Sequence, residues 1–244
     1  IEEQDKMTDE LRASLLAADS KARLEDLYLP YKPKRRTKAM IAREAGLEPL
    51  AVALLADPTL APEAEAARYL RPDAEDDTKV PDVTAALEGA RQILVEQFAE
   101  DAGLVGSLRD YVWGEAKLVS RVVQGKEKEG VRFSDYFEYA EPIAKVPSHR
   151  ALAVFRGRKE EVLRVSIAVG DPDTPPRPHP CEIRIASHFG IADKGRPADE
   201  WMLKVAGWAW RVKISLHIEL ELMTRLWNAA EEEGIRVFAG NLRD

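Results

Sequence analysis

One helical pattern constrains the fold of this chain more than any other feature of its sequence. It opens at Pro197 and runs to about Glu233, which makes a helix roughly 50 Å long at the usual rise per residue. A first stripe, apolar except for its serine, comprises Trp201, Val205, Trp208, Val212, Ser215, Ile218, Leu222 and Leu226, and a second comprises Leu203, Trp210, Ile214 and Leu220. Since a helix that is apolar on more than one side is usually surrounded by other elements, we expect this helix to be the spine of the fold.

The first 145 residues predict an array of packed helical hairpins. Short stretches with helical periodicity alternate there with glycines, prolines and polar loops, which end helices. The expected helices cover 8–28, 38–45, 47–56, 62–70, 81–102 and 104–114, and one more covers 181–189 before the spine. Thr8 and Thr37 are suited to cap the first two. The predicted fold class is therefore mainly α.

The pattern changes after Lys145. Residues 151–156 and 162–169 are β-prone runs separated by a charged link, and the second run alternates at first as a half-exposed strand does. We therefore expect a small β-hairpin near 151–169 in an otherwise helical chain.

Three segments are predicted along the chain. Residues 1–75 form a helical subdomain with a basic arm and a hairpin that resembles a helix-turn-helix, and its end is marked by the acidic loop 71–78. Residues 76–145 form a helical hairpin array. Residues 146–244 hold the β-hairpin, an irregular connector with five prolines in 171–180, and the spine.

Composition limits the functions open to the chain. Its formal net charge is -7 and its pI is near 5.4, so any affinity for nucleic acid has to be focal. The single cysteine, Cys181, excludes an internal disulfide framework and fits a reducing cytosol. No apolar run of about 18 residues is present in the sequence. We therefore expect a cytoplasmic protein without a membrane span.

A basic segment stands out against this acidic background. Five cations fall within residues 32–38, beside two tyrosines. Pro30 and Pro33 restrict the backbone around them, so the cations are expected on a semi-rigid, extended arm. The candidate phosphate contacts are Lys32, Lys34, Arg35, Arg36, Lys38 and Arg43, with Tyr31 as a stacking platform.

The same arm is equally suited to a structural role. Its arginines can be held by carboxylates of the acidic helices nearby, in which case the arm is a strap within the fold. If it binds nucleic acid instead, the affinity falls with salt and shows no sequence preference, because phosphates are contacted rather than bases.

Residues 40–55 resemble a helix-turn-helix. Ala42 and Gly46 fall where that motif needs a small residue and a turn glycine, and Leu47 and Val52 are expected to pack the two helices together. The second helix offers Glu48, Leu50, Ala51 and Ala53, which are not side chains that read bases in the major groove. The pattern therefore favours a packed helical hairpin over a base-reading unit.

No catalytic or metal-binding constellation emerges from the sequence. A structural zinc site takes four ligands. His179, Cys181 and His188 have no second Cys or His pair at a sequence spacing that would complete such a site. Ser148 and His149 are adjacent in sequence, and adjacent residues rarely face each other as members of a catalytic triad do. We expect no metal, no cofactor and no enzymatic activity.

Several stretches of the sequence are distinctive. They are LEDLYLPYKPKRRTKAMIAR at 24–43, GLEPLA at 46–51, DYFEY at 135–139, IAKVPSHRAL at 143–152, FRG at 155–157 and IRVFAGNLRD at 235–244. These stretches closely resemble the Tex family of bacterial transcription accessory proteins. The resemblance runs over essentially the whole chain. It implies a cytoplasmic protein, related to a eukaryotic transcription elongation factor, that binds nucleic acid with little sequence preference.

The resemblance also implies that this chain is only the N-terminal helical portion of such a protein, cut from a longer chain at both ends. An RNase H-like domain is then expected to follow Asp244, and after it helix-hairpin-helix units and an OB-fold RNA-binding domain that carries much of the binding. Two hypotheses remain. The chain is a helical scaffold that helps to bind RNA or DNA, or it is an interaction scaffold that docks RNA polymerase or ribosomal partners and uses the arm only structurally.

Overall fold

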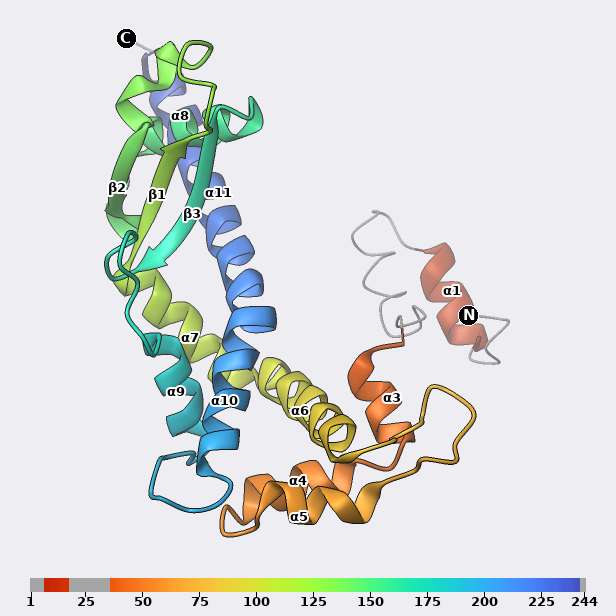
Figure 1. The fold of residues 1–244 in the computed structure, drawn as a ribbon. Coiled ribbons are helices and arrows are strands. Elements are labelled where there is room, and N and C mark those ends of the chain that lie inside the picture. The colour runs from red at the N-terminus through yellow and green to blue at the C-terminus, as the bar shows by residue number, and fades with distance from the viewer. Residues whose placement is uncertain (1–6, 18–35, 242–244) are drawn as a thin grey trace.

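The computed structural model describes residues 7–17 and 36–241, and Figure 1 shows how they are arranged. The α-helices are α1 (Asp9–Leu16), α3 (Lys38–Glu44), α4 (Glu48–Ala56), α5 (Pro62–Ala66), α6 (Val83–Glu100), α7 (Ala102–Glu115), α8 (Ser148–Lys159), α9 (Pro180–His188), α10 (Asp199–Ala209) and α11 (Ser215–Asn241). Short 3-10 turns cover Ala67–Tyr69, Val131–Tyr136 and Ile143–Lys145. The mainly α-helical fold class is confirmed.

Both predicted threonine caps are present. Thr8 Oγ1 accepts a hydrogen bond from the N–H of Leu11 at 3.1 Å, and Thr37 Oγ1 accepts one from the N–H of Met40 at 3.1 Å. Each cap satisfies an amide group that the first helical turn leaves without a partner. Beyond α1, the helix predicted to reach Tyr28 lies outside the described residues.

α3 and α4 form the predicted helical hairpin. Gly46 lies in its link with a φ of +81°, a left-handed conformation that glycine adopts at little cost. Leu47 is buried as expected. Val52 is exposed, contrary to the prediction, because α4 turns Leu50 and Leu54 inward instead. Both helices pack against α6, as α5 does.

Three antiparallel strands form a small sheet in the order β2-β1-β3 (Figure 1). β1 spans Ala116–Val122, β2 spans Glu138–Pro142 and β3 spans Leu163–Val169. α8 packs against β3, and the N–H of Ile167 donates to Glu219 of α11 at 3.2 Å. The helices therefore cover one side of the sheet.

The β-hairpin predicted near 151–169 is wrong in its first half. Residues 163–169 form the strand β3, but residues 151–156 lie in α8. Ala151, Val154 and Phe155 are buried together because a spacing of three and four residues places them on one helical face. The periodicity of a run this short is compatible with a helix or a strand. In the structure the run is helical, and α8 packs against α11.

α10 and α11 form one continuous spine, joined by a π-helical segment at Trp210–Ile214. The predicted long helix is confirmed, and it continues past Glu233. Buried side chains recur at every fourth position along it, namely Trp210, Ile214, Ile218, Leu222, Leu226 and Ala230.

The π-helical segment explains where the predicted stripes depart from the structure. A π turn holds more residues than an α turn. The buried positions after the segment are therefore shifted by one residue in the sequence, while in space they stay on the same side of the spine. Val212 is consequently turned to solvent, although the α-helical spacing placed it on the first stripe. Leu220 of the second stripe is exposed as well.

Buried side chains of these elements belong to one hydrophobic cluster. The hairpin of α3 and α4 lies at one end of the molecule and the sheet at the other, with α6, α7 and the spine between them (Figure 1). Among the helices of the described residues, none has the length and apolarity needed to cross a membrane. The three segment boundaries stay predictions.

Candidate nucleic-acid interface

The structure describes three of the seven residues predicted to contact nucleic acid. These are Arg36, just before α3, and Lys38 and Arg43 within it. The other four, Tyr31, Lys32, Lys34 and Arg35, lie outside the described residues.

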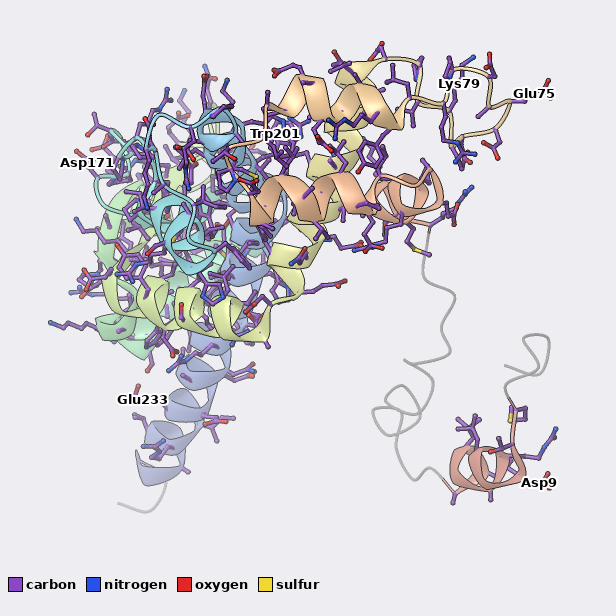
Figure 2. The ribbon with its side chains drawn as sticks, turned by 90° about the horizontal axis from the view of Figure 1, so that it is seen from below. Asp9, Glu75, Lys79, Asp171, Trp201 and Glu233 are labelled. Carbon is purple, nitrogen blue, oxygen red and sulfur yellow. The ribbon has the colours of Figure 1, made fainter. Side chains whose placement is uncertain are left out.

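Arg36 is held by two carboxylates. Its guanidinium forms ion pairs with Glu44 at the end of α3 and with Asp77 in the loop before α6. That loop projects from the body of the protein near Glu75 and Lys79 (Figure 2). The hydrogen bond to Glu44 is the main cause of a raised pKa of Arg36. Both partners are about half exposed, so water and salt screen these pairs.

Arg43 is anchored more deeply. It donates to Glu96 of α6, which is only 7% exposed, and also pairs with Glu48 at 3.3 Å. The Thr37 hydroxyl donates to the same Glu96 carboxylate at 3.0 Å. Burial opposes ionisation of Glu96, but the hydrogen bonds from Arg43 and Thr37 outweigh it and lower the pKa. Glu96 therefore ties the start and the end of α3 to α6.

Lys38 differs from the two arginines. Its side chain is exposed, and it has no ion pair within the described part of the chain. Its charge acts on the Glu88 carboxylate at longer range. Of the predicted cations that the structure describes, Lys38 is therefore the one that a ligand can contact without breaking an ion pair.

The sequence did not single out Glu96 or Asp77 as partners of the arginines. Glu96 carried a signal, because it falls between Val95 and Phe98 in a stretch of buried α6 residues and a buried carboxylate needs a cation. Asp77 carried none, since it is one of several acidic residues in an exposed loop.

The histidines and the cysteine considered for zinc have other partners. His179 Nδ1 accepts the N–H of Cys181 at 3.2 Å, and its ring stacks on Trp210 with centroids 4.9 Å apart. Cys181 is buried, and burial raises the pKa of its thiol to about 12. His188 lies 3.4 Å from Asp101. Over the described residues, no group of three or more His, Cys, Asp or Glu side chains is placed to hold a metal ion.

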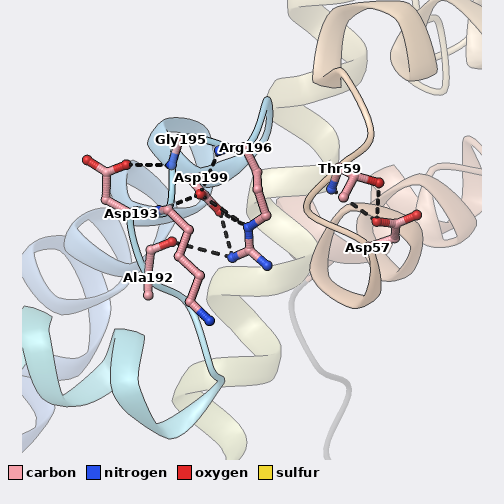
Figure 3. A network of polar contacts seen from close by, with 8 residues as sticks. Asp57, Thr59, Ala192, Asp193, Gly195, Arg196 and Asp199 are labelled. Atoms are coloured by element: carbon pink, nitrogen blue, oxygen red, sulfur yellow. Dashed lines mark hydrogen bonds and ion pairs between the residues drawn. The ribbon is translucent and has the colours of Figure 1, made fainter.

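A second polar network, which the sequence did not predict, joins distant parts of the chain. Asp199, at the start of α10, accepts the N–H groups of Lys194 and Arg196 at 2.7 and 3.0 Å and the Arg196 guanidinium at 2.8 Å (Figure 3). The N–H of Ala198 donates to Pro58 in the turn between α4 and α5 at 3.1 Å. Hydrogen bonding from Arg196 is the main reason that the pKa of Asp199 falls to about 2. This network fixes the loop before the spine and carries no sign of chemistry.

Together these features define a helical scaffold with a small antiparallel sheet and a basic segment fastened at its end to α6. The Tex central region-like family model matches residues 57–238, which is most of the chain. The chain belongs to the Tex family.

Individual relatives agree with this assignment. The chain is 53% identical over 246 residues to Protein YhgF of Escherichia coli and 51% identical over 245 residues to the transcriptional accessory protein Tex of Neisseria gonorrhoeae. Both matches cover 100% of this chain and 31% of the relative, so the chain spans about a third of these proteins. It is also 31% identical over 180 residues, 70% of this chain and 17% of the relative, to S1 RNA-binding domain-containing protein 1 of Pongo abelii.

Proposed function

We propose that this chain is a non-enzymatic helical scaffold of a cytoplasmic transcription accessory protein, and that its basic arm contacts RNA or DNA without sequence preference. The observation that carries the proposal is the concentration of five cations within residues 32–38 of a chain with a net charge of -7. One relative is named a transcriptional accessory protein and another is named for an RNA-binding domain, which supports a role in nucleic-acid binding.

The ion pairs divide the arm's cations into two groups. Arg43 serves chiefly as an anchor, because releasing it would leave the buried carboxylate of Glu96 with only the more distant cation Lys213, at 3.9 Å. Arg36 can exchange its screened carboxylates for a phosphate. Lys32, Lys34, Arg35 and Lys38 supply the remaining phosphate contacts, with Tyr31 as a platform for a base.

Fluorescence anisotropy with single-stranded RNA and duplex DNA across a salt series tests this proposal. We expect micromolar binding whose log affinity falls linearly with log salt concentration. The double variant Lys34→Glu/Arg35→Glu should weaken it and lower its salt slope by about 2, while leaving the ion pairs of Arg36 and Arg43 intact. The matched control is Lys128→Glu/Lys204→Glu, which reverses two exposed lysines elsewhere. Absence of binding at low salt, or equal loss in both double variants, contradicts the proposal.

A second function is supported by an exposed apolar stripe on the spine. Val212, Leu216 and Leu220 follow one another at intervals of four residues and are 49%, 68% and 63% exposed. Three branched aliphatic side chains in line on one helix are suited to docking a protein partner. In this alternative the chain docks RNA polymerase or a ribosomal protein, and the arm is only a strap.

Surface plasmon resonance with purified bacterial RNA polymerase core and with ribosomes tests the alternative. Leu216→Glu should abolish binding if the stripe is the docking surface. Val52→Glu is the matched control, because it places the same charge on an exposed aliphatic position of α4. Binding that survives Leu216→Glu, or no binding of either partner, would count against docking through this stripe.

A further inference from the structure

One face of the sheet carries cations that the basic arm does not account for. β1 contributes Lys117 and Arg121, and β3 contributes Arg164. Side chains alternate along a strand, so residues four apart, such as Lys117 and Arg121, share a face. Residues directly opposite on paired strands also share a face, and the register sets Arg121 opposite Arg164.

This face is the open one. On β2, the members of the face are Glu138, Ala140 and Pro142, and all three are exposed, whereas the residues between them are partly buried. On β3, Arg164 and Ser166 are exposed between the buried Leu163 and Val165. α8 packs against the other side of the sheet.

The side chains on either side of β1 are small, and Val119, which lies between Lys117 and Arg121 on β1 itself, is only 4% exposed. Ala140 and Ser166 flank the centre of β1 from either side, and Ala168 lies opposite Lys117. None of them projects far from the sheet, so an extended polymer can lie across this face and reach the cations. The described residues of the face include no aromatic side chain, so it offers no platform for stacking bases.

The cations of this face are unevenly paired within the protein, because Lys117 interacts electrostatically with Asp171 of the connector. Like charges directly opposite each other destabilise a sheet, yet Arg121 and Arg164 occupy such a pair. Within the described residues, the side chain of Arg164 has neither an ion pair nor a hydrogen-bond partner, and it is exposed. Arg121 lies opposite Glu138 on β2 and meets one further carboxylate, Asp173, whose two oxygens lie 3.3 Å from its Nη2.

Asp173 belongs to the connector between β3 and α9, which brings a second acid, Asp171, to the same region. The Asp173 side chain is 75% exposed, so water screens its pair with Arg121 and the contact is weak. Asp171 accepts the N–H of Asp173 at 2.9 Å and the hydroxyl of Thr174 at 2.8 Å, which fixes the turn. Figure 2 shows Asp171 at the edge of the molecule.

We propose that Lys117, Arg121 and Arg164 bind the phosphodiester backbone of single-stranded nucleic acid, and that Asp173 competes with the backbone for Arg121. A phosphate can accept two parallel hydrogen bonds from a guanidinium, whereas the exposed Asp173 carboxylate contacts Arg121 through Nη2 alone. Binding at this face depends on salt and not on sequence, because only phosphates are contacted. The site goes beyond the contact assigned to the arm, since it uses other residues on another element.

The test is fluorescence anisotropy of the full 244-residue chain with a fluorescein-labelled, single-stranded oligouridylate. It is done in the wild type and in the arm variant Lys34→Glu/Arg35→Glu. We expect binding to persist in the arm variant. Adding Arg164→Ala should weaken it and reduce the salt slope by about 1. Adding Asp173→Asn should strengthen it up to about fivefold, because the competing carboxylate is removed.

Two matched controls separate local from general charge effects. Arg156→Ala removes an exposed arginine from α8, and Glu100→Gln removes an exposed carboxylate from the end of α6; both should leave binding unchanged. Urea unfolding curves show whether Arg164→Ala folds like the wild type. The gain in affinity expected for Asp173→Asn cannot come from misfolding.

The outcomes also separate this site from the arm. If binding already disappears in Lys34→Glu/Arg35→Glu without any further substitution, the sheet site is overturned and the arm is supported. Unchanged affinity in both Arg164→Ala and Asp173→Asn overturns the sheet site as well. If polyglutamate displaces the labelled RNA at a lower concentration than unlabelled oligouridylate does, the face serves an acidic protein segment and the proposal is wrong.

Discussion

At the scale of single residues, the carboxylate of Glu96 decides what the end of the basic segment does. It lies in α6 with little access to water, and it receives hydrogen bonds from Arg43 and Thr37. A buried carboxylate is stable only when such partners compensate for its lost hydration. Arg43, which the sequence presents as a phosphate contact, is therefore occupied by the fold.

We expect Glu96→Gln to lower the free energy of unfolding by about 1–2 kcal/mol, because the charge-assisted bond to Arg43 is replaced by a weaker one. Urea denaturation measures the change. Glu48→Gln removes the more exposed partner of the same arginine and should cost much less. Equal losses in the two variants would show that burial of Glu96 is not the cause.

Gly46 is the other residue on which α3 and α4 depend. Its φ of +81° is unfavourable for any residue with a Cβ atom. Gly46→Ala should therefore destabilise the protein by about 1–2 kcal/mol. Gly106→Ala is the matched control, because Gly106 lies within α7 where an added Cβ meets nothing within 4 Å. There, thermal unfolding should show a small gain of about 0.5–1 kcal/mol.

At the scale of elements, the π-helical segment keeps the spine in register with its surroundings. The buried face of α10, which includes Met202, Val205 and Ala209, continues as Ile214 and Ile218 in the next turns. A regular α-helix would rotate the second set away by about 100° for the one extra residue. The segment therefore behaves as a one-residue insertion within an otherwise α-helical spine.

Deletion of Val212 tests this account. It should convert the segment to a regular α-helix and keep both apolar faces aligned, so we expect a folded protein with a cooperative thermal transition. Deletion of Thr224, an exposed residue of α11, should rotate the rest of the helix by about 100° and turn its buried residues away from α8. Circular dichroism melts of the two deletions measure the difference. Equal damage in both would refute the insertion account.

At the scale of the whole molecule, a few polar contacts join segments that are distant in sequence. Asp199 fixes the loop before the spine, and Ala198 in that loop donates to Pro58 beyond α4. The strength of this connection depends on the charge of Asp199. Its pKa in the folded protein, about 2, lies below the ordinary value of 3.8. Ionised Asp199 therefore stabilises the fold at pH values above the unfolded pKa, and this stabilisation is lost as the pH falls through the folded pKa.

We therefore expect Asp199→Asn to lower the melting temperature at neutral pH. The difference from the wild type should narrow as the pH falls from about 3.8 toward about 2, where Asp199 takes up a proton. Differential scanning fluorimetry across this range measures it. Glu200→Gln alters the adjacent residue, which pairs with Lys204 on the exposed surface, and should produce only a small shift in melting temperature. A difference for Asp199→Asn that stays constant with pH would contradict the assignment.

How far the sequence predicted the structure depends on the length of each pattern. The spine, about twelve turns long over 199–241, could be recognised as a helix because so many positions agree. β1 and β2 were not predicted, since β1 follows α7 directly with no loop between Glu115 and Ala116, and β2 is five residues long. Residues 151–156 fitted two structures equally, and only the neighbouring α11 distinguishes them.

The candidate sites divide in a similar way. Composition and spacing located the basic arm, because clustered charge is a local property of the chain. Whether its arginines are free could not be read from the sequence, since Asp77 and Glu96 are 41 and 53 residues away from their partners. The pair of Arg121 and Arg164 likewise exists only through the register of β1 and β3.

Local patterns in the sequence were enough to predict the helical character of this protein, the caps of α1 and α3, the turn at Gly46 and its family resemblance. These follow from local preferences and short spacings, which a chain carries wherever it folds. The tertiary structure alone decided the sheet, the phase of the spine across Trp210–Ile214 and the partners of the arginines. Such features depend on contacts between distant segments, and those contacts exist only once the chain has packed.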